Sequence, residues 1–251
     1  MFLLAAALLF GGGVRGARAA LSIISDNYVA RMQLQDIGVS LLENGERVSW
    51  RDYVAGSDGL WDTGTSELLG NVLEEGEPWQ PGRTYPEELQ VKNSGSIDTF
   101  VRVSIYKYWT DADGVKRTDL DPSLIELGIP EGTGWTVDTD ASTPERTVLY
   151  YGAVLPATSG GEELDIGDAR RVTAPFLESV TINAGIARRV TQTTTEETGA
   201  DGAVWRTVTT VYDYDGALFH VRVSADAVQT HNASDAIGSA WGVDPALSGQ
   251  G

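Results

Sequence analysis

Cysteine is absent from the 251-residue sequence, and histidine occurs only as His220 and His231. The absence of cysteine excludes a disulfide framework, a thiolate metal site and a cysteine nucleophile. The two histidines do not form an H-E-x-x-H zinc motif, and no G-x-S-x-G sequence marks a serine nucleophile. We therefore expect no enzymatic activity, with a mixed histidine and carboxylate zinc site as the remaining catalytic alternative.

Basic residues are scarce, because 18 Lys and Arg residues stand against 36 Asp and Glu residues and give a net charge of -18. Phosphate binding needs clustered cations, so this acidity argues against a nucleic-acid partner. It also disfavours binding to anionic lipid surfaces. An acidic surface keeps a protein soluble, and it can also collect divalent cations or meet a basic partner.

Long hydrophobic runs are missing, and the one apolar stretch, Phe2–Phe10, is too short to span a bilayer. Small residues follow it, and Ala17-Arg18-Ala19 matches the A-x-A pattern of signal-peptide cleavage. We therefore expect residues 1–19 to be a signal peptide that is cut after Ala19. The mature chain is then secreted to the cell surface or the extracellular matrix, with no membrane span after cleavage.

Alternation of apolar and polar residues is the main structural signal in the rest of the chain. It is strongest over Thr99–Trp109, where Val101, Val103, Ile105 and Lys107 fall on one face. Asp-Gly pairs at 113–114, 201–202 and 215–216 indicate hairpin turns with a strand on each side. The other expected strands are Arg31–Leu42, Glu87–Lys92, Thr147–Leu155, Glu178–Asn183, Ala187–Thr195, Val204–Tyr214 and Ala217–Ala227.

Two short helices are expected among these strands. Asp121-Pro122-Ser123 has a capping aspartate and a proline at the first helical position, and Ser234–Trp241 can form one or two turns. We predict an all-β protein, an antiparallel β-sandwich of jelly-roll type with long loops, built as a single domain over residues 20–251. Residues 44–82 are weakly periodic and rich in tryptophan, and we interpret them as an insertion in this domain.

Two stretches of the sequence carry a family resemblance. Residues 81–97 combine a Pro-Gly turn, an amphipathic strand, the turn Asn93-Ser94-Gly95-Ser96 and the start of another strand. Near the N-terminus, a glycine-rich leader precedes Ser22–Met32 and then Asp36–Leu41. In this order and spacing the motifs resemble the TasA/camelysin family, whose signal peptides are cut by a SipW-type peptidase. The resemblance covers residues 10–42 and 80–110 and fades beyond them.

The resemblance implies a jelly-roll protein that builds extracellular fibres in bacterial biofilms, with self-association or a related matrix subunit as the partner. In that family the N-terminal segment of one subunit fills a strand position in the next, which is β-augmentation. Here the donor would lie within residues 20–34, and signal cleavage would free it. The alternative is that this segment pairs with its own subunit as an ordinary first strand.

Two other functions stay open at this point. An extracellular carbohydrate- or protein-binding β module would use exposed aromatic residues, for which Tyr106, Tyr108, Trp109 and Tyr150-Tyr151 are the candidates. Core packing or a cross-strand ladder is the alternative role for these rings. A camelysin-like metallopeptidase is the third function, and the absence of an H-E-x-x-H motif argues against it.

Calcium is the metal that the sequence favours, although no cofactor is required. Asp111, Asp113, Asp119 and Asp121 bracket a glycine-containing loop, and hard cations bind several converging oxygen atoms. The segment lacks the closing glutamate of an EF-hand. The alternative is a hairpin with an Asp-Gly turn, in which Asp121 only caps the following helix.

Overall fold

The structure is a computed structural model, and it describes residues 20–24, 37–53, 61–66, 68–69, 72–73, 77–200 and 203–243. For residues 20–24, 51–53 and 61–63 only the backbone is described. The predicted signal peptide and residues 25–34 of the predicted donor segment lie outside the described residues. Within the described part of the chain, no helix is long and apolar enough to cross a membrane.

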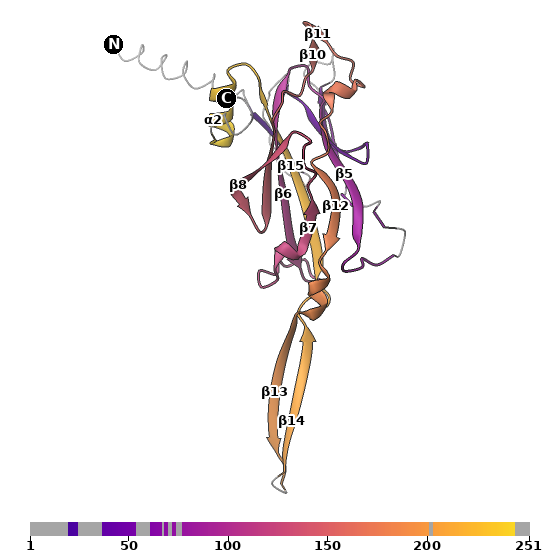
Figure 1. Cartoon of the computed structure of the whole chain (residues 1–251), viewed down its shortest axis with the longest axis vertical. Coiled ribbons are helices and arrows are strands. Elements are labelled where there is room, and N and C mark those ends of the chain that lie inside the picture. The colour runs from indigo at the N-terminus through magenta and orange to yellow at the C-terminus, as the bar shows by residue number, and fades with distance from the viewer. Residues whose placement is uncertain are drawn as a thin grey trace, which may run out of the picture.

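Two antiparallel sheets face each other and form a sandwich (Figure 1). The first sheet has the order β1 (Ala20–Ile24), β15 (Leu218–Gln229), β6 (Thr99–Thr110), β9 (Arg146–Tyr151) and β8 (Trp135–Thr143). The second has the order β4 (Trp61–Thr65), β3 (Glu46–Tyr53), β2 (Val39–Glu43), β5 (Thr84–Asn93), β12 (Leu177–Ile182) and β7 (Ile125–Gly128). The prediction of an all-β antiparallel sandwich is confirmed, while its jelly-roll connectivity stays a prediction.

Period-two alternation produces the core between the sheets. On β6, Val101, Val103 and Ile105 are at most 1% exposed, as their predicted common face requires. They pack with side chains of the second sheet, such as Leu89 and Val91 of β5, in one continuous hydrophobic cluster. Burial of such a cluster is the main favourable contribution to folding, at roughly 25 cal/mol per Å² of apolar surface.

Part of the outer face of the first sheet is covered by the C-terminal helix α2 (Ala233–Trp241). Phe100 and Tyr150, which alternate with core residues on β6 and β9, pack with Ile237 and Trp241 in a second hydrophobic cluster. The short helix predicted near the C-terminus is therefore present. Because α2 packs on this side, part of the first sheet has buried side chains on both of its faces.

Strands β5 and β6 are consecutive in the chain but belong to different sheets, so the turn predicted at 93–96 crosses the sandwich. Asn93 is fully buried and stabilises this crossing. Its side-chain Nδ2 donates to the carbonyl oxygens of Ile97 and Leu155, both at 2.9 Å. Its Oδ1 accepts from the backbone N–H of Gly95 at 2.9 Å.

Two local features differ from or refine the sequence predictions. Residues 44–82 contain β3 and β4, which extend the second sheet, so much of the predicted insertion is sheet. The predicted turn at 215–216 is present, but the prediction that it closes a hairpin is wrong. The strand before it, β14 (Val204–Tyr212), pairs with β13 (Val190–Thr198), and the strand after it, β15, pairs with β6. The remaining elements are β10 (Thr158–Ser159), β11 (Glu162–Glu163), η1 (Pro122–Leu124), η2 (Ala169–Arg171) and η3 (Ala184–Arg188).

Candidate functional site

The outer edge of β15 is the first candidate site, because it receives the N-terminal strand. Strand β6 pairs with β15 along all 12 of its residues. On the other side, β1 pairs only with Ser224–Val228, in the antiparallel register that sets Ala20 opposite Val228 and Ile24 opposite Ser224. In the described structure no strand pairs with residues 218–223 on that side.

The residues of β15 that lie beside β1 are buried, and those at its other end are more exposed. Residues Val223–Val228 are all buried, whereas Leu218 is 52% exposed. Ala225 and Ala227 face the core between the sheets, and Val228 packs in the cluster under α2. Pairing with β1 gives the backbone N–H and C=O groups of this buried part of β15 hydrogen-bond partners on its outer side.

An ion pair lies under the same part of the edge. The guanidinium of Arg102 on β6 donates to Oδ2 of Asp226 from Nη2 at 2.6 Å and from Nε at 3.0 Å. Asp226 is 4% exposed, and its Oδ1 has no hydrogen-bond partner among the described atoms. Sequence reasoning missed this pair, although an aspartate in the apolar stretch Val223–Val228 is a signal for a buried charge with a partner.

A long hairpin is the second candidate site. Strands β13 and β14 pair without a register shift from Val190–Tyr212 to Thr198–Val204 and project from the sandwich as an arm (Figure 1). All residues of both strands are exposed. The hairpin predicted around residues 201–202 is confirmed by this pairing, although the two turn residues lie outside the described ones.

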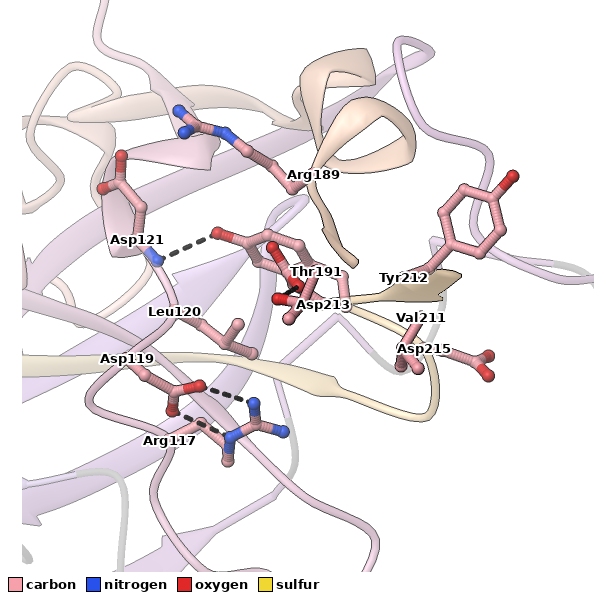
Figure 2. Close-up of a pocket in the computed structure, with 11 residues that line it drawn as sticks. Arg117, Asp119, Leu120, Asp121, Arg189, Thr191, Val211, Tyr212, Asp213 and Asp215 are labelled. Carbon is pink, nitrogen blue, oxygen red and sulfur yellow. Dashed lines mark hydrogen bonds and ion pairs between the residues drawn. The ribbon is translucent and has the colours of Figure 1, made fainter. Parts of the chain in front are cut away.

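The base of the arm, residues 190 and 212, adjoins a hollow of about 690 Å³ (Figure 2). Arg117 and Arg189 lie on opposite sides of it. The other lining residues are Asp119, Leu120, Asp121, Thr191, Val211, Tyr212, Asp213, Tyr214 and Asp215. The hollow therefore combines cationic and anionic side chains, and its lining has neither histidine nor lysine as a general base.

Tyr214, at the base of the arm, holds the arm to the sandwich. The backbone N–H of Asp121 donates to the Tyr214 hydroxyl at 2.9 Å, while within the base of the arm the hydroxyl of Thr191 donates to Asp213 Oδ1 at 2.6 Å. The Tyr214 ring packs edge-on against Trp109, with ring centroids 4.9 Å apart. Because Trp109 is buried on β6, these contacts fix the direction of the arm.

The four aspartates predicted to bind calcium are placed in two groups. Asp111 accepts backbone N–H bonds from Asp113 and Val115 within its own turn. Asp119 and Asp121 line the hollow. Arg117 donates two hydrogen bonds to Asp119 and lowers the pKa of that carboxyl to about 2.

Asp121 caps η1, as predicted, by accepting the backbone N–H of Ser123 at 2.8 Å, which lowers its pKa. Among the described residues no three His, Asp or Glu side chains are grouped to hold a metal ion. The calcium site stays a prediction. If it forms, millimolar calcium should raise the melting temperature, because a ligand that binds only the folded state stabilises it.

A calcium effect should disappear in the variant Asp119→Asn and should not be reproduced by magnesium, which demands a stricter geometry. The control is Asp138→Asn, because Asp138 lies on β8 and is not among the residues that line the hollow beside Asp119 and Asp121. An unchanged melting temperature at millimolar calcium would remove the calcium hypothesis.

The predicted aromatic platform is divided between different environments. Trp109 and Tyr150 are buried, and Tyr151 packs against Trp135. Tyr106 and Tyr108 occupy the outer face of the first sheet, where Tyr108 stacks on His220 at 4.8 Å. This histidine also lies 2.9 Å from the hydroxyl of Thr110, so it acts as a strand-face residue.

Comparisons with known proteins add no assignment. Neither the models of known families, nor the curated proteins, nor the solved structures give a match to the chain.

Proposed function

We propose that the chain is an exported structural protein of a bacterial surface or biofilm matrix that assembles by donor-strand exchange. The N-terminal segment of one copy would pair with β15 of the next. The observation that carries the proposal is the position of β1. It is the first described strand, it stands at the end of its sheet, and its only strand partner among the described residues is β15.

Exchange requires no new contact in the protein. A strand that completes its own β15 can complete the β15 of a neighbour with the same hydrogen bonds, as in domain swapping. The 14 residues between Ile24 and Val39 connect β1 to β2 and span at most about 50 Å when extended. Since β1 pairs with the same β15 sequence within one molecule or between two, the choice between these two arrangements depends on the linker and on protein concentration.

The predicted cleavage site supports the timing of assembly. Strand β1 begins at Ala20, directly after Ala19 at the expected cut. Before cleavage the segment is tethered to the signal peptide, and afterwards it is the free end of the chain. A free end can enter a neighbouring edge without threading a loop, so assembly is confined to the time after export.

The absence of cysteine allows a direct test by cross-linking. Ile24 and Ser224 are opposite in the β1–β15 register, and directly opposite residues of antiparallel strands can be joined by a disulfide. Two mature chains, one with Ile24→Cys and the other with Ser224→Cys, are mixed, assembled and oxidised. We expect a covalent heterodimer on a denaturing gel.

The matched control replaces Ser224→Cys by Ser104→Cys. Ser104 is opposite Ser224 on β6, so it lies one strand farther from β1 and beyond the reach of a disulfide. The double variant Ile24→Cys/Ser224→Cys, oxidised as a dilute monomer, should stay monomeric and assemble only after reduction. Fibres that form from the oxidised double variant would overturn strand exchange.

Deletion of residues 20–34 tests the same segment by electron microscopy. The shortened mature chain should remain a folded monomer by circular dichroism and should form no fibres, whereas the intact mature chain should form them. Fibres from the shortened chain would remove the donor role. Dispersed intact monomers that bind glycans would instead favour the carbohydrate-binding alternative.

A further inference from the structure

We infer that strand β14 of the arm is a self-association surface that pairs antiparallel with β14 of a second copy of this chain. The inference is independent of donor-strand exchange, because the arm and the β15 edge are different parts of the molecule (Figure 1). It rests on three properties of the arm, which are its open edges, its self-complementary sequence and its low charge.

The edges of the arm are open and carry little of the usual protection. Among the described residues, β13 and β14 pair only with each other. Natural edge strands are commonly blocked by charged side chains, above all lysine, by proline or by a bulge, and β14 has Arg206 as its one charged residue. Neither strand contains lysine or proline, and the register is continuous over all 9 residues. An isolated two-stranded hairpin is marginally stable in water, so added strands would stabilise the arm.

Apolar side chains are concentrated on β14. Val204, Trp205, Val208, Val211 and Tyr212 are between 54% and 68% exposed. On β13 the only large hydrophobic residue is Val190, which is 39% exposed. Burial of aromatic and β-branched side chains is the main source of cross-strand stabilisation, so β14 is the strand that gains more from a partner.

The sequence of β14 is self-complementary about Val208. In an antiparallel pair centred there, Trp205 faces the partner's Val211 and Val204 faces the partner's Tyr212. These are aromatic and β-branched pairs, which are among the favourable cross-strand combinations. Thr207 and Thr209 face each other, and Arg206 faces the partner's Thr210, so no like charges meet. A twofold interface requires this kind of self-matching surface.

Charge favours contact through the arm over contact through the sandwich. The described residues of the arm carry only Glu196, Glu197 and Arg206 as charged groups, and Arg206 pairs with Glu196 across the strands. The whole chain has a net charge of -18. Full overlap of two arms would hold the acidic sandwiches about 30 Å apart, several times the screening length of about 8 Å at physiological salt.

Cysteine scanning of the mature chain tests the twofold axis. In Val208→Cys the two introduced thiols would be opposite each other, so mild oxidation should convert most of the chain to a covalent dimer. The control is Thr194→Cys, because Thr194 is opposite Val208 on the same face of the arm but on β13. It should give little dimer. Denaturing gels detect this covalent dimer whether or not fibres form. A missing Val208→Cys dimer would therefore contradict pairing through β14 without bearing on donor-strand exchange.

Lysine at the same two positions gives a second, non-covalent test by sedimentation. Val208→Lys would place two ammonium groups opposite each other at the axis and should raise the dimer dissociation constant about tenfold or more. Thr194→Lys adds the same charge at the other edge and should change it little. Equal effects of both variants, or an effect of Thr194→Lys alone, would overturn pairing through β14.

Discussion

Replacement of Arg171 by methionine should lower the free energy of unfolding by about 3–5 kcal/mol, because several buried carbonyl oxygens lose their donor at a cost of about 1–3 kcal/mol each. The side chain is 1% exposed. Its guanidinium donates to the carbonyl oxygens of Gly95 at 2.7 Å and Ala157 at 3.1 Å, and also to those of Asn93 and Leu164. One side chain therefore joins the 93–96 turn to both ends of the β10–β11 hairpin.

Methionine retains most of the volume of the arginine stem but leaves these carbonyl oxygens buried without donors. Arg171→Lys keeps the charge and loses the planar fork of donors, so the stability of this variant should lie between that of the natural chain and that of Arg171→Met. The control is Arg170→Met, because the Arg170 side chain is 59% exposed and pairs with Asp168 at the surface. Urea unfolding measures all three variants. A midpoint for Arg171→Met equal to that of Arg170→Met would contradict the role of this residue.

Glu87→Gln should remove a marked pH dependence of stability. Glu87 is 1% exposed and lies beside Glu43, which is also buried. Burial raises the pKa of Glu87 from 4.5 to about 8, and the hydrogen bond with Glu43 and its charge act in the same direction. Between these two pH values the folded protein holds a proton that the unfolded chain has released.

The folded state therefore loses stability as pH rises through this window, by up to about 1.4 kcal/mol for each pH unit. Below pH 4.5 and above pH 8 the contribution of Glu87 is flat. Glutamine is uncharged at every pH, so the variant should be more stable than the natural chain near pH 8 and show a flatter profile. Glu88→Gln, at the exposed neighbouring position, is the control. Parallel profiles for the natural chain and Glu87→Gln would contradict this prediction.

Strict alternation is what made the sandwich predictable. Thr99–Trp109 alternates over its full length, and the observed β6 differs from it by one residue. Residues 44–82 gave no such pattern, because β3 and β4 lie toward an edge of the second sheet and include polar residues on both faces. The pairing partners of the strands could not be predicted either, since the sequence of a β-strand does not specify which strand lies beside it.

The candidate sites were predictable only in part. A carboxylate on the buried face of β5 is visible in the sequence, because Glu87 follows the same alternation as Leu89 and Val91. The proximity of Glu43 depends on the pairing of β2 with β5, which the sequence does not specify. The arm was recognisable as a hairpin, but its full exposure was not predicted, although β13 has no continuous apolar face.

The pairing of Ala20 with Val228 has a consequence for biosynthesis. The first sheet joins two strands that are about 200 residues apart in the sequence, so β15 becomes available only after all the intervening residues have been made. At about 5–20 residues per second, β1 waits roughly 10–40 seconds for β15 after it has been translated. During that interval the N-terminal strand has no partner of its own, and chaperones can bind it.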